Sequence, residues 1–220
     1  MLKSSKPLQK ILNEVFMMSY EKFTTAHSSD LLRENSAPVT SMVITAFFAA
    51  MIFLGIQFFR IPLPAAVGTP FLHFGHIFVM LSVVCLGNKR SAAAAVLGLV
   101  IFDLLNGYLH AIPNVFVSTV INCMLSGTLF AALKKKASGS LHKEYIYGVL
   151  CAAVYGISNI VIDFIWSTAE LMFIGSSLPT AIAAEISSIP ATMINAGFTV
   201  IGIALLYMPI TTAYNRILRR

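Results

Sequence analysis

Long apolar runs separated by short polar or basic connections constrain this chain more than any other feature. After position 40 the runs cover residues 41–59, 71–86, 91–105, 112–133, 145–173 and 181–207. A helix that crosses a membrane needs about 20 mostly apolar residues. Charged residues make up only 11% of the 220 positions, whereas soluble domains average about 25%. The sequence therefore predicts an all-α integral membrane protein with six transmembrane helices.

The placement of basic residues predicts how these helices are oriented. If both termini are cytoplasmic, fourteen of the fifteen Lys and Arg residues lie on the cytoplasmic side, and Arg60 is the one outer cation. Cytoplasmic loops of membrane proteins carry such an excess of Lys and Arg. The same placement accounts for the net charge of +6 without phosphate contacts. We therefore expect the lipid bilayer as a partner and no nucleic acid.

Three regions follow from this pattern. Residues 1–40 form a cytoplasmic N-terminal segment, residues 41–210 a six-helix membrane domain, and residues 211–220 a basic cytoplasmic tail. In the first region apolar residues recur at helical spacing, which is typical of a short amphipathic helix on the membrane surface. A loosely ordered tail fits this segment equally well. The recurring apolar residues are Leu8, Ile11, Leu12, Val15 and Phe16.

The second and third apolar runs form a predicted membrane hairpin over residues 71–108. A tight basic turn, Asn-Lys-Arg at 88–90, connects them. His73, His76 and Asp103 stand at the ends of the runs that are far from this turn. If the turn is cytoplasmic, these three side chains lie together near the outer face of the membrane.

The remaining carboxylates within the runs also fall in their outer halves. These are Asp163 and Glu170 in the fifth run and Glu185 at the start of the sixth. Charged groups within membrane spans usually face a bundle interior or a cavity rather than lipid. The inner halves hold no carboxylate apart from Glu144 at a loop edge. The pattern therefore predicts a pocket that opens to the outer side only.

Three polar stripes at helical spacing strengthen the prediction of a pocket. Residues three or four positions apart share one face of a helix. We expect a flat ligand ring to stack on Trp166 while side-chain acceptors bind its polar edge. The alternatives are an interfacial belt position for Trp166, a solvated position for Glu170, and purely interhelical hydrogen bonds for the amides. The stripes are Asn114, Ser118 and Asn122; Asn159, Asp163, Trp166 and Glu170; and Glu185, Ser188, Thr192 and Asn195.

His73 and His76 are three positions apart and could bind a metal ion together with Asp103. A hydrogen-bonding role or a place in the pocket wall is the favoured interpretation, and we expect no metal site and no cofactor in this chain. The sequence contains no G-x-x-x-x-G-K-[ST], G-x-S-x-G or H-E-x-x-H motif, so it offers no known signature of ATP binding or hydrolysis. Uphill transport would therefore draw on an ion gradient or on a partner.

The hairpin resembles a known family, the substrate-binding S components of energy-coupling-factor (ECF) vitamin transporters, in their riboflavin-transporter-like branch. Gly87 precedes the basic turn, small residues open the third run at 91–95, and this run ends in Asp-Leu-Leu-Asn-Gly-Tyr at 103–108. The family usually has an acid after a glycine at the start of span two, whereas this chain has His76 after Gly75. The contacts of that acid are therefore not carried over.

A second similarity lies in the first apolar run, where Ala46 and Ala50 form an Ala-x-x-x-Ala pattern. It looks like the motif with which these proteins dock on the transmembrane T component. The resemblance implies capture of a vitamin on the outer side, with the loop at 60–70 as a lid, which would explain the outer Arg60. It also implies transport with a T component and two cytoplasmic ABC-type ATPases, which use the ATP. The docked face would be small and apolar, as Ala46, Ala50 and the run at 91–95 allow.

We therefore expect a multi-pass protein of the bacterial cell membrane that is not an enzyme. It would be the high-affinity binding subunit for uptake of a small water-soluble vitamin or precursor, energised by a separate ATPase module. Because acids dominate the pocket, a nitrogen heterocycle of the hydroxymethylpyrimidine or pyridoxine type is favoured; riboflavin and cobalamin stay open because the sequence does not measure cavity volume. The alternatives are an ion-coupled secondary carrier and a metal-dependent membrane enzyme. The predicted substrate-binding residues are Arg60, His73, His76, Asp103, Asn114, Asp163, Trp166, Glu170 and Glu185.

Overall fold

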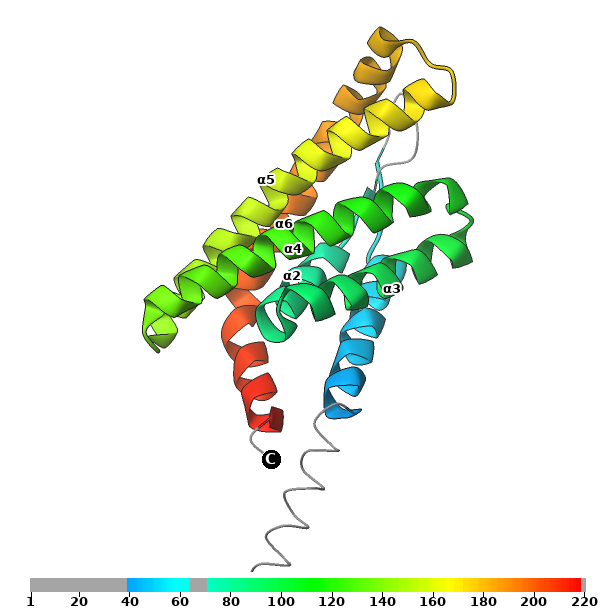
Figure 1. Cartoon of the computed structure of the whole chain (residues 1–220). Helices are drawn as coiled ribbons and strands as arrows, with labels where there is room; N and C mark the ends of the chain where they lie inside the picture. Colours follow the sequence, from blue (N-terminus) through cyan, green and yellow to red (C-terminus); the bar gives the residue numbers. More distant parts are fainter. Residues whose placement is uncertain (1–38, 64–70, 219–220) are drawn as a thin grey trace, which may run out of the picture. The chain divides into compact units, whose positions relative to one another are not determined.

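The computed structural model describes residues 39–63 and 71–218. The predicted amphipathic helix of the N-terminal segment lies outside the described residues, as does most of the loop at 60–70. The chain divides into two compact units, Met1–Ile44 and Thr45–Arg220. The described elements are the helix Val39–Gln57, strands β1 (Ile61–Pro62) and β2 (Phe71–Leu72), helices α2 (Gly75–Leu86) and α3 (Asn88–Asn106), the 3-10 helix η1 (Leu109–Ala111), and helices α4 (Ile112–Ala137), α5 (Leu141–Phe173) and α6 (Leu178–Leu218) (Figure 1).

The predicted all-α membrane fold is confirmed for the described residues, although not every predicted span has full length. Four helices are long and apolar enough to cross a membrane: Val39–Gln57, the stretch Leu109–Ala137 that contains α4, α5 and α6. Helix α2 has 12 residues and is about 18 Å long, which is shorter than the roughly 30 Å hydrocarbon core. Helix α3 has 19 residues, but its first turn is polar and basic.

Apolar side chains point outward from the long helices as well as inward. On α5 the exposed residues Ile146, Leu150, Ile157, Val161 and Ile165 recur at intervals of four or seven. Residues at this spacing form one continuous helix face. A soluble monomer rarely exposes such a large apolar surface. This face of α5 is therefore suited to lipid.

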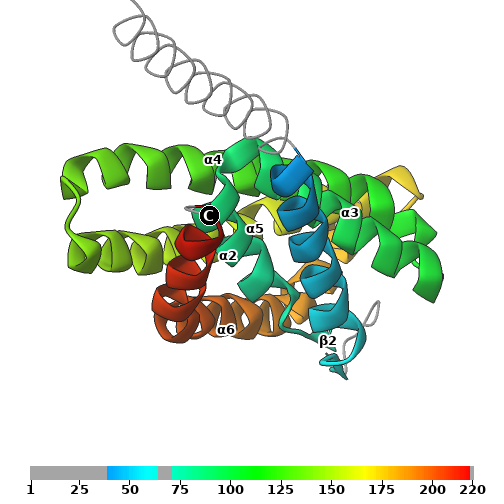
Figure 2. The same cartoon turned by 90° about the horizontal axis from the view of Figure 1, so that it is seen from below.

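Helix α2 is the central element of the second unit. Apart from His76 and Ser82 its residues are apolar, and most of them are buried. It packs against α3, α4 and α6 and lies among the other helices in Figure 2. Helices α5 and α6 run side by side and share the most extensive contact in the structure (Figure 1). A helix that is apolar on all sides is stable only when its neighbours cover it.

The connection between α2 and α3 is tighter than predicted. Gly87 alone separates the two helices, with φ 76°, and residues 88–90 form the first turn of α3 instead of a loop. A positive φ is accessible to glycine at little cost. The prediction of a turn at 88–90 was therefore wrong by one to three residues, because a single left-handed glycine suffices to reverse the chain.

The start of the predicted second span is also different, because Phe71 and Leu72 are extended instead of helical. They pair with β1 in an antiparallel ribbon in which Ile61 faces Leu72 and Pro62 faces Phe71. Proline has no amide hydrogen and disfavours helix in the residue before it. The prolines of the loop at 60–70 thus favour extended chain beside them. Helix α2 begins only at Gly75.

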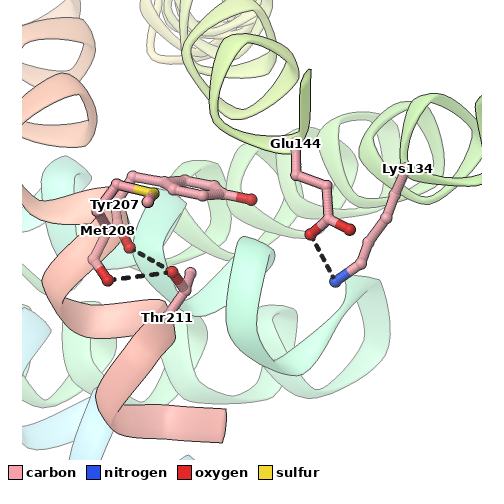
Figure 3. A network of polar contacts seen from close by, with 5 residues as sticks. All are labelled: Lys134, Glu144, Tyr207, Met208 and Thr211. Carbon is pink, nitrogen blue, oxygen red and sulfur yellow. Dashed lines mark hydrogen bonds and ion pairs between the residues drawn. The ribbon is translucent and has the colours of Figure 1, made fainter. Parts of the chain in front are cut away.

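The last two helices are longer than their predicted spans, and polar contacts support their ends. Helix α5 begins at Leu141 and α6 continues to Leu218, through much of the predicted tail. Lys134 on α4 and Glu144 on α5 form an ion pair at 3.3 Å, and the hydroxyl of Thr211 donates to the carbonyl of Tyr207 at 2.6 Å (Figure 3). Such hydroxyl bonds to the preceding turn are common for Ser and Thr within helices.

Gly98 allows α3 to approach the Val39–Gln57 helix closely, and we predict that it tolerates no larger residue. A Cβ atom at Gly98 would lie 2.6 Å from the carbonyl oxygen of Ala49, whereas one at Gly197 on α6 would meet no atom within 4 Å. Overpacking typically costs about 1–3 kcal/mol, and glycine to alanine in an open helix position gains up to about 1 kcal/mol. Gly98→Ala should lower the thermal unfolding midpoint in detergent, and Gly197→Ala should not. An unchanged midpoint for Gly98→Ala would contradict this packing.

Candidate functional site

A cavity of about 480 Å³ lies where one end of each helix from α2 to α6 meets. It is lined by the beginnings of α2, α4 and α6, the end of α3 and the second half of α5. A smaller pocket of about 130 Å³, called the side pocket below, shares several of these residues and is also lined by Ile56, Leu99 and Phe102. Pockets for small ligands typically measure about 300–1,000 Å³.

Acidic and imidazole side chains dominate the polar lining of the cavity. Asp103 is the most enclosed of the acids, with only 6% of its surface exposed. Among the described lining residues there is no Lys or Arg. Such a cavity attracts cations and hydrogen-bond donors and disfavours anions. The acids are Asp103, Asp163, Glu170 and Glu185, and the histidines are His73, His76 and His110.

The Asp-Leu-Leu-Asn-Gly-Tyr sequence at the end of α3 holds several parts of the site together. Gly107 ends the helix in a left-handed conformation with φ 80°, and the amide of Tyr108 turns back to donate to the carbonyl of Asp103 at 2.9 Å. This geometry closes a helix C-terminus and satisfies its free carbonyls. Asn106 donates to Gln57 at 2.8 Å, which joins α3 to the end of the first described helix.

Asn114 connects α4 to α5 within the cavity wall. Its side-chain amide donates to Asp163 Oδ1 at 3.3 Å and to Ser167 Oγ at 3.2 Å. Asp163 and Ser167 are four positions apart and therefore stand on the same face of α5. The predicted residues Asn114 and Asp163 are thus direct neighbours in the structure.

Asn195 on α6 fixes the extended residues that precede α2. Its carbonyl oxygen accepts the backbone amide of His73 at 3.0 Å, and its amide donates to the carbonyl of Phe71 at 3.0 Å. Both bonds join α6 to the backbone of the segment that precedes α2. A single buried side chain therefore sets where this part of the cavity wall lies.

His73 and His76 are adjacent, with ring centroids 4.7 Å apart. His73 Nδ1 accepts the amide hydrogen of Gly75 at 3.2 Å, so this nitrogen carries no proton. His76 Nδ1 is 2.9 Å from the hydroxyl of Tyr155, a buried residue on α5. The two histidines therefore connect the start of α2 to its surroundings as well as lining the cavity.

A second polar contact between α4 and α5 continues from the cavity into the bundle. Asn122 donates to Asn159 Oδ1 at 3.1 Å, and its own carbonyl accepts the hydroxyl of Ser158. Asn122 is completely buried, whereas Asn159 also lines the cavity. Interhelical hydrogen bonds thus account for Asn122, as the alternative interpretation of the amides proposed.

Two predicted site residues are absent from the lining of the cavity. Ser167 lines the cavity and Trp166 does not. Successive helix residues turn by about 100°, so Trp166 points about 60° away from the direction of Asp163. Arg60 lies with its guanidinium carbon 5.4 Å from the ring centre of Phe102, which lines the side pocket. Such a distance is typical of a cation–π contact. The other seven predicted binding residues all line the cavity.

Aromatic residues that the sequence interpretation did not select also line the cavity. Phe71 and Tyr108 lie with ring centres 6.2 Å apart, and Tyr108 stacks on Phe102 at 5.9 Å with an angle of 23°. Tyr108 is the last residue of the Asp-Leu-Leu-Asn-Gly-Tyr sequence, and only this motif indicated a role for it. Phe71 and His110 stand outside the polar stripes, so helical spacing gave no indication of them.

The small residues predicted to form a docking face divide into exposed and buried groups. Ala46 and Ala50 are exposed on one face of their helix, whereas their neighbour Ala49 is buried. In the run at 91–95 only Ala93 is exposed, and the other four residues are buried inside the bundle. Of this run, only Ala93 is therefore exposed where it could contribute to a docking face. Its small side chains allow close packing of α3 within the fold.

His73, His76 and Asp103 are not arranged as a three-ligand metal site. Among the described residues, no group of three His, Cys, Asp or Glu side chains is placed to hold a metal ion. The Nδ1 atoms of His73 and His76 have hydrogen-bonding partners at Gly75 and Tyr155. A three-ligand centre built from these residues does not match this geometry.

Comparison with known proteins gives one match. Residues 36–215 match the family model described as "ECF-type riboflavin transporter, S component". No curated protein and no solved structure matches the chain. The matched range includes every residue that lines the cavity.

We predict that Asn195 keeps the backbone of Phe71 and His73 protected from solvent. Asn195→Leu removes both bonds at similar volume and takes away the side-chain acceptor of the buried His73 amide, and a buried group without a partner costs about 1–3 kcal/mol. Hydrogen–deuterium exchange of a peptide that covers residues 71–73 should accelerate about tenfold or more. Thr192→Val is the matched control, because the hydroxyl of Thr192 bonds only to the carbonyl of Ser188 on its own helix. Unchanged exchange in Asn195→Leu would contradict this role.

Proposed function

The chain belongs to the family of ECF-type riboflavin transporter S components, and we propose that it captures a small water-soluble vitamin or vitamin precursor for uptake. It is a multi-pass membrane protein, and its family is one of transport subunits rather than enzymes. The observation that carries the proposal is the cavity of about 480 Å³ with four carboxylic acids in its wall. The affinity of such subunits comes from enclosing a ligand among convergent polar groups.

A ring ligand with hydrogen-bond donors suits this cavity best. Four acids and no described Lys or Arg in the lining favour a neutral or cationic nitrogen heterocycle over an anion. Phe71 and Tyr108 supply the aromatic surface that was expected from Trp166. Hydroxymethylpyrimidine and pyridoxine have this chemistry and fit the volume. Riboflavin is named in the family description, so its affinity should be measured beside theirs. A corrin such as cobalamin is large for a cavity of about 480 Å³.

The orientation in the membrane is part of the same proposal. The chain crosses the membrane six times with both termini in the cytoplasm, which places fourteen of fifteen basic residues inside. Gly87 and the Lys134–Glu144 ion pair then lie at the cytoplasmic end. The cavity lies at the opposite ends of the same helices, and in the proposed orientation it faces the outer side. In a bacterial cell membrane this arrangement exposes the cavity to external nutrients.

Energy for uptake comes from partner subunits in this proposal. The described residues contain no ATPase domain, and family membership implies a transmembrane T component and two cytoplasmic ABC-type ATPases that use ATP. Ala46 and Ala50 form a small exposed surface on one helix face. Small side chains allow the helices of two subunits to approach closely in lipid. We assign the T component contact to this surface.

The acids of the cavity should contribute directly to ligand affinity. Glu185→Gln should weaken binding of hydroxymethylpyrimidine to purified protein about tenfold or more, because a charge-assisted hydrogen bond contributes about 1.5–3 kcal/mol. Glu144→Gln is the matched control, since it changes the same residue type in the ion pair at the other end of the bundle. Isothermal titration calorimetry measures both. The proposal fails if the wild-type protein binds no ring vitamin.

The two exposed alanines should be required for transport but not for binding. Ala46→Trp and Ala50→Trp should abolish vitamin uptake in cells that contain the partner subunits, while the affinity of the purified protein stays unchanged. Ala131→Trp, at an exposed position on α4, should affect neither. Loss of affinity would show that Ala46 and Ala50 serve the fold. Uptake that persists without the ATPases would instead favour an ion-coupled carrier.

A further inference from the structure

The amide of Asn114 has only one orientation that agrees with its neighbours. Both hydrogen bonds that its nitrogen donates lead to α5, to Asp163 Oδ1 and Ser167 Oγ. An ionised carboxylate only accepts hydrogen bonds. If the amide of Asn114 rotated by half a turn, its oxygen would face the carboxylate of Asp163. An ionised Asp163 therefore determines that Asn114 directs its oxygen, not its nitrogen, away from α5.

Two acceptor oxygens in the cavity wall have no donor. Asp103 Oδ2 and Asn114 Oδ1 are both buried, and neither has a hydrogen-bond partner among the described residues. Both residues line the cavity and the side pocket. A buried acceptor without a partner typically costs about 1–3 kcal/mol. Two such oxygens at the junction of two pockets indicate where a ligand's donors are needed.

We propose that Asp103 and Asn114 are the specificity-determining residues of the cavity, and that Asp163 is a positioning residue that acts through Asn114. The ligand group they select carries at least two hydrogen-bond donors, as an amino-substituted heterocycle does. Asp103 Oδ2 and Asn114 Oδ1 accept these donors. The inference rests on the proposed function and adds to it which chemical edge of the ligand the protein recognises.

Asp103 and Asp163, which the sequence analysis assigned to the same binding site, have different roles in this proposal. Asp103 supplies an acceptor oxygen to the ligand, whereas one oxygen of Asp163 is already bonded to Asn114. Glu170 and Glu185 have no bond to Asn114 and add negative charge to the wall. A ligand that lacks donors would leave the two buried oxygens unpaired, and sites of this kind reject such analogues strongly.

The test uses two ligands that differ in one group. The first is 4-amino-5-hydroxymethyl-2-methylpyrimidine, and the second carries a methyl group in place of the 4-amino group. Methyl and amino groups are similar in size, but only the amino group donates hydrogen bonds. The wild-type protein should bind the amino compound about tenfold or more tightly than the methyl compound. The ratio of the two affinities is the selectivity that the variants change.

A double-mutant cycle distinguishes positioning from direct contact. Asp163→Asn, which is isosteric, should lower the selectivity toward one, and in the Asn114→Leu background it should have no further effect. Glu170→Gln is the control, because its effect should add to that of Asn114→Leu. Size-exclusion profiles and thermal unfolding show that each variant is folded, and Asn114→Ala replaces Asn114→Leu if the leucine variant is not.

Each outcome separates this inference from the proposed function. Equal affinity of the wild type for the amino and methyl compounds overturns the inference and leaves the proposed function standing. Binding of riboflavin or pyridoxine without binding of either pyrimidine does the same. Additive effects of Asp163→Asn and Asn114→Leu overturn the positioning role, because Asp163 would then contact the ligand itself. Binding of no ring vitamin removes the proposed function and the inference together.

Discussion

The backbone at the start of α2 has to find hydrogen-bond partners inside the bundle, and much of the structure depends on how it does so. Within a bilayer there is no water to satisfy exposed amides and carbonyls. Helix α2 has only 12 residues and is surrounded by other helices, and the extended residues Phe71 and Leu72 before it pack against α6. Asn195 accepts the amide of His73 and donates to the carbonyl of Phe71. The same contacts hold one wall of the cavity in place.

Polar side chains elsewhere in the bundle also form hydrogen bonds between helices, except at the cavity. Asn122 is fully buried and pairs with Asn159 and Ser158, so that contact is internally satisfied. At the cavity, Asn114 pairs on one side only, and its oxygen and that of Asp103 have no donor among the described residues. Buried polar groups normally have partners. The polar contacts between the helices thus serve structure in the interior and become available to a ligand where the helices separate.

The sequence predicted the apolar helices and the region where polar groups collect, because both depend on composition along single helices. It did not predict the residue-level details that depend on contacts between segments. Trp166 and Ser167 differ by one position, and only packing decides which of them faces the cavity. The extended Phe71 depends on its pairing with Pro62, and the buried small residues of α3 depend on the close approach of the first described helix at Gly98. These features require neighbours that periodicity cannot identify.

The first described helix carries both a part of the pocket wall and the proposed docking surface. Ile52 and Ile56 are buried, and Ile56 lines the side pocket beside Phe102, while Ala46 and Ala50 are exposed. At its end Gln57 is bonded to Asn106, three residues beyond Asp103. Packed interfaces shift between discrete arrangements instead of deforming continuously. A ligand in the side pocket and a partner subunit at the proposed docking surface would therefore contact the same helix.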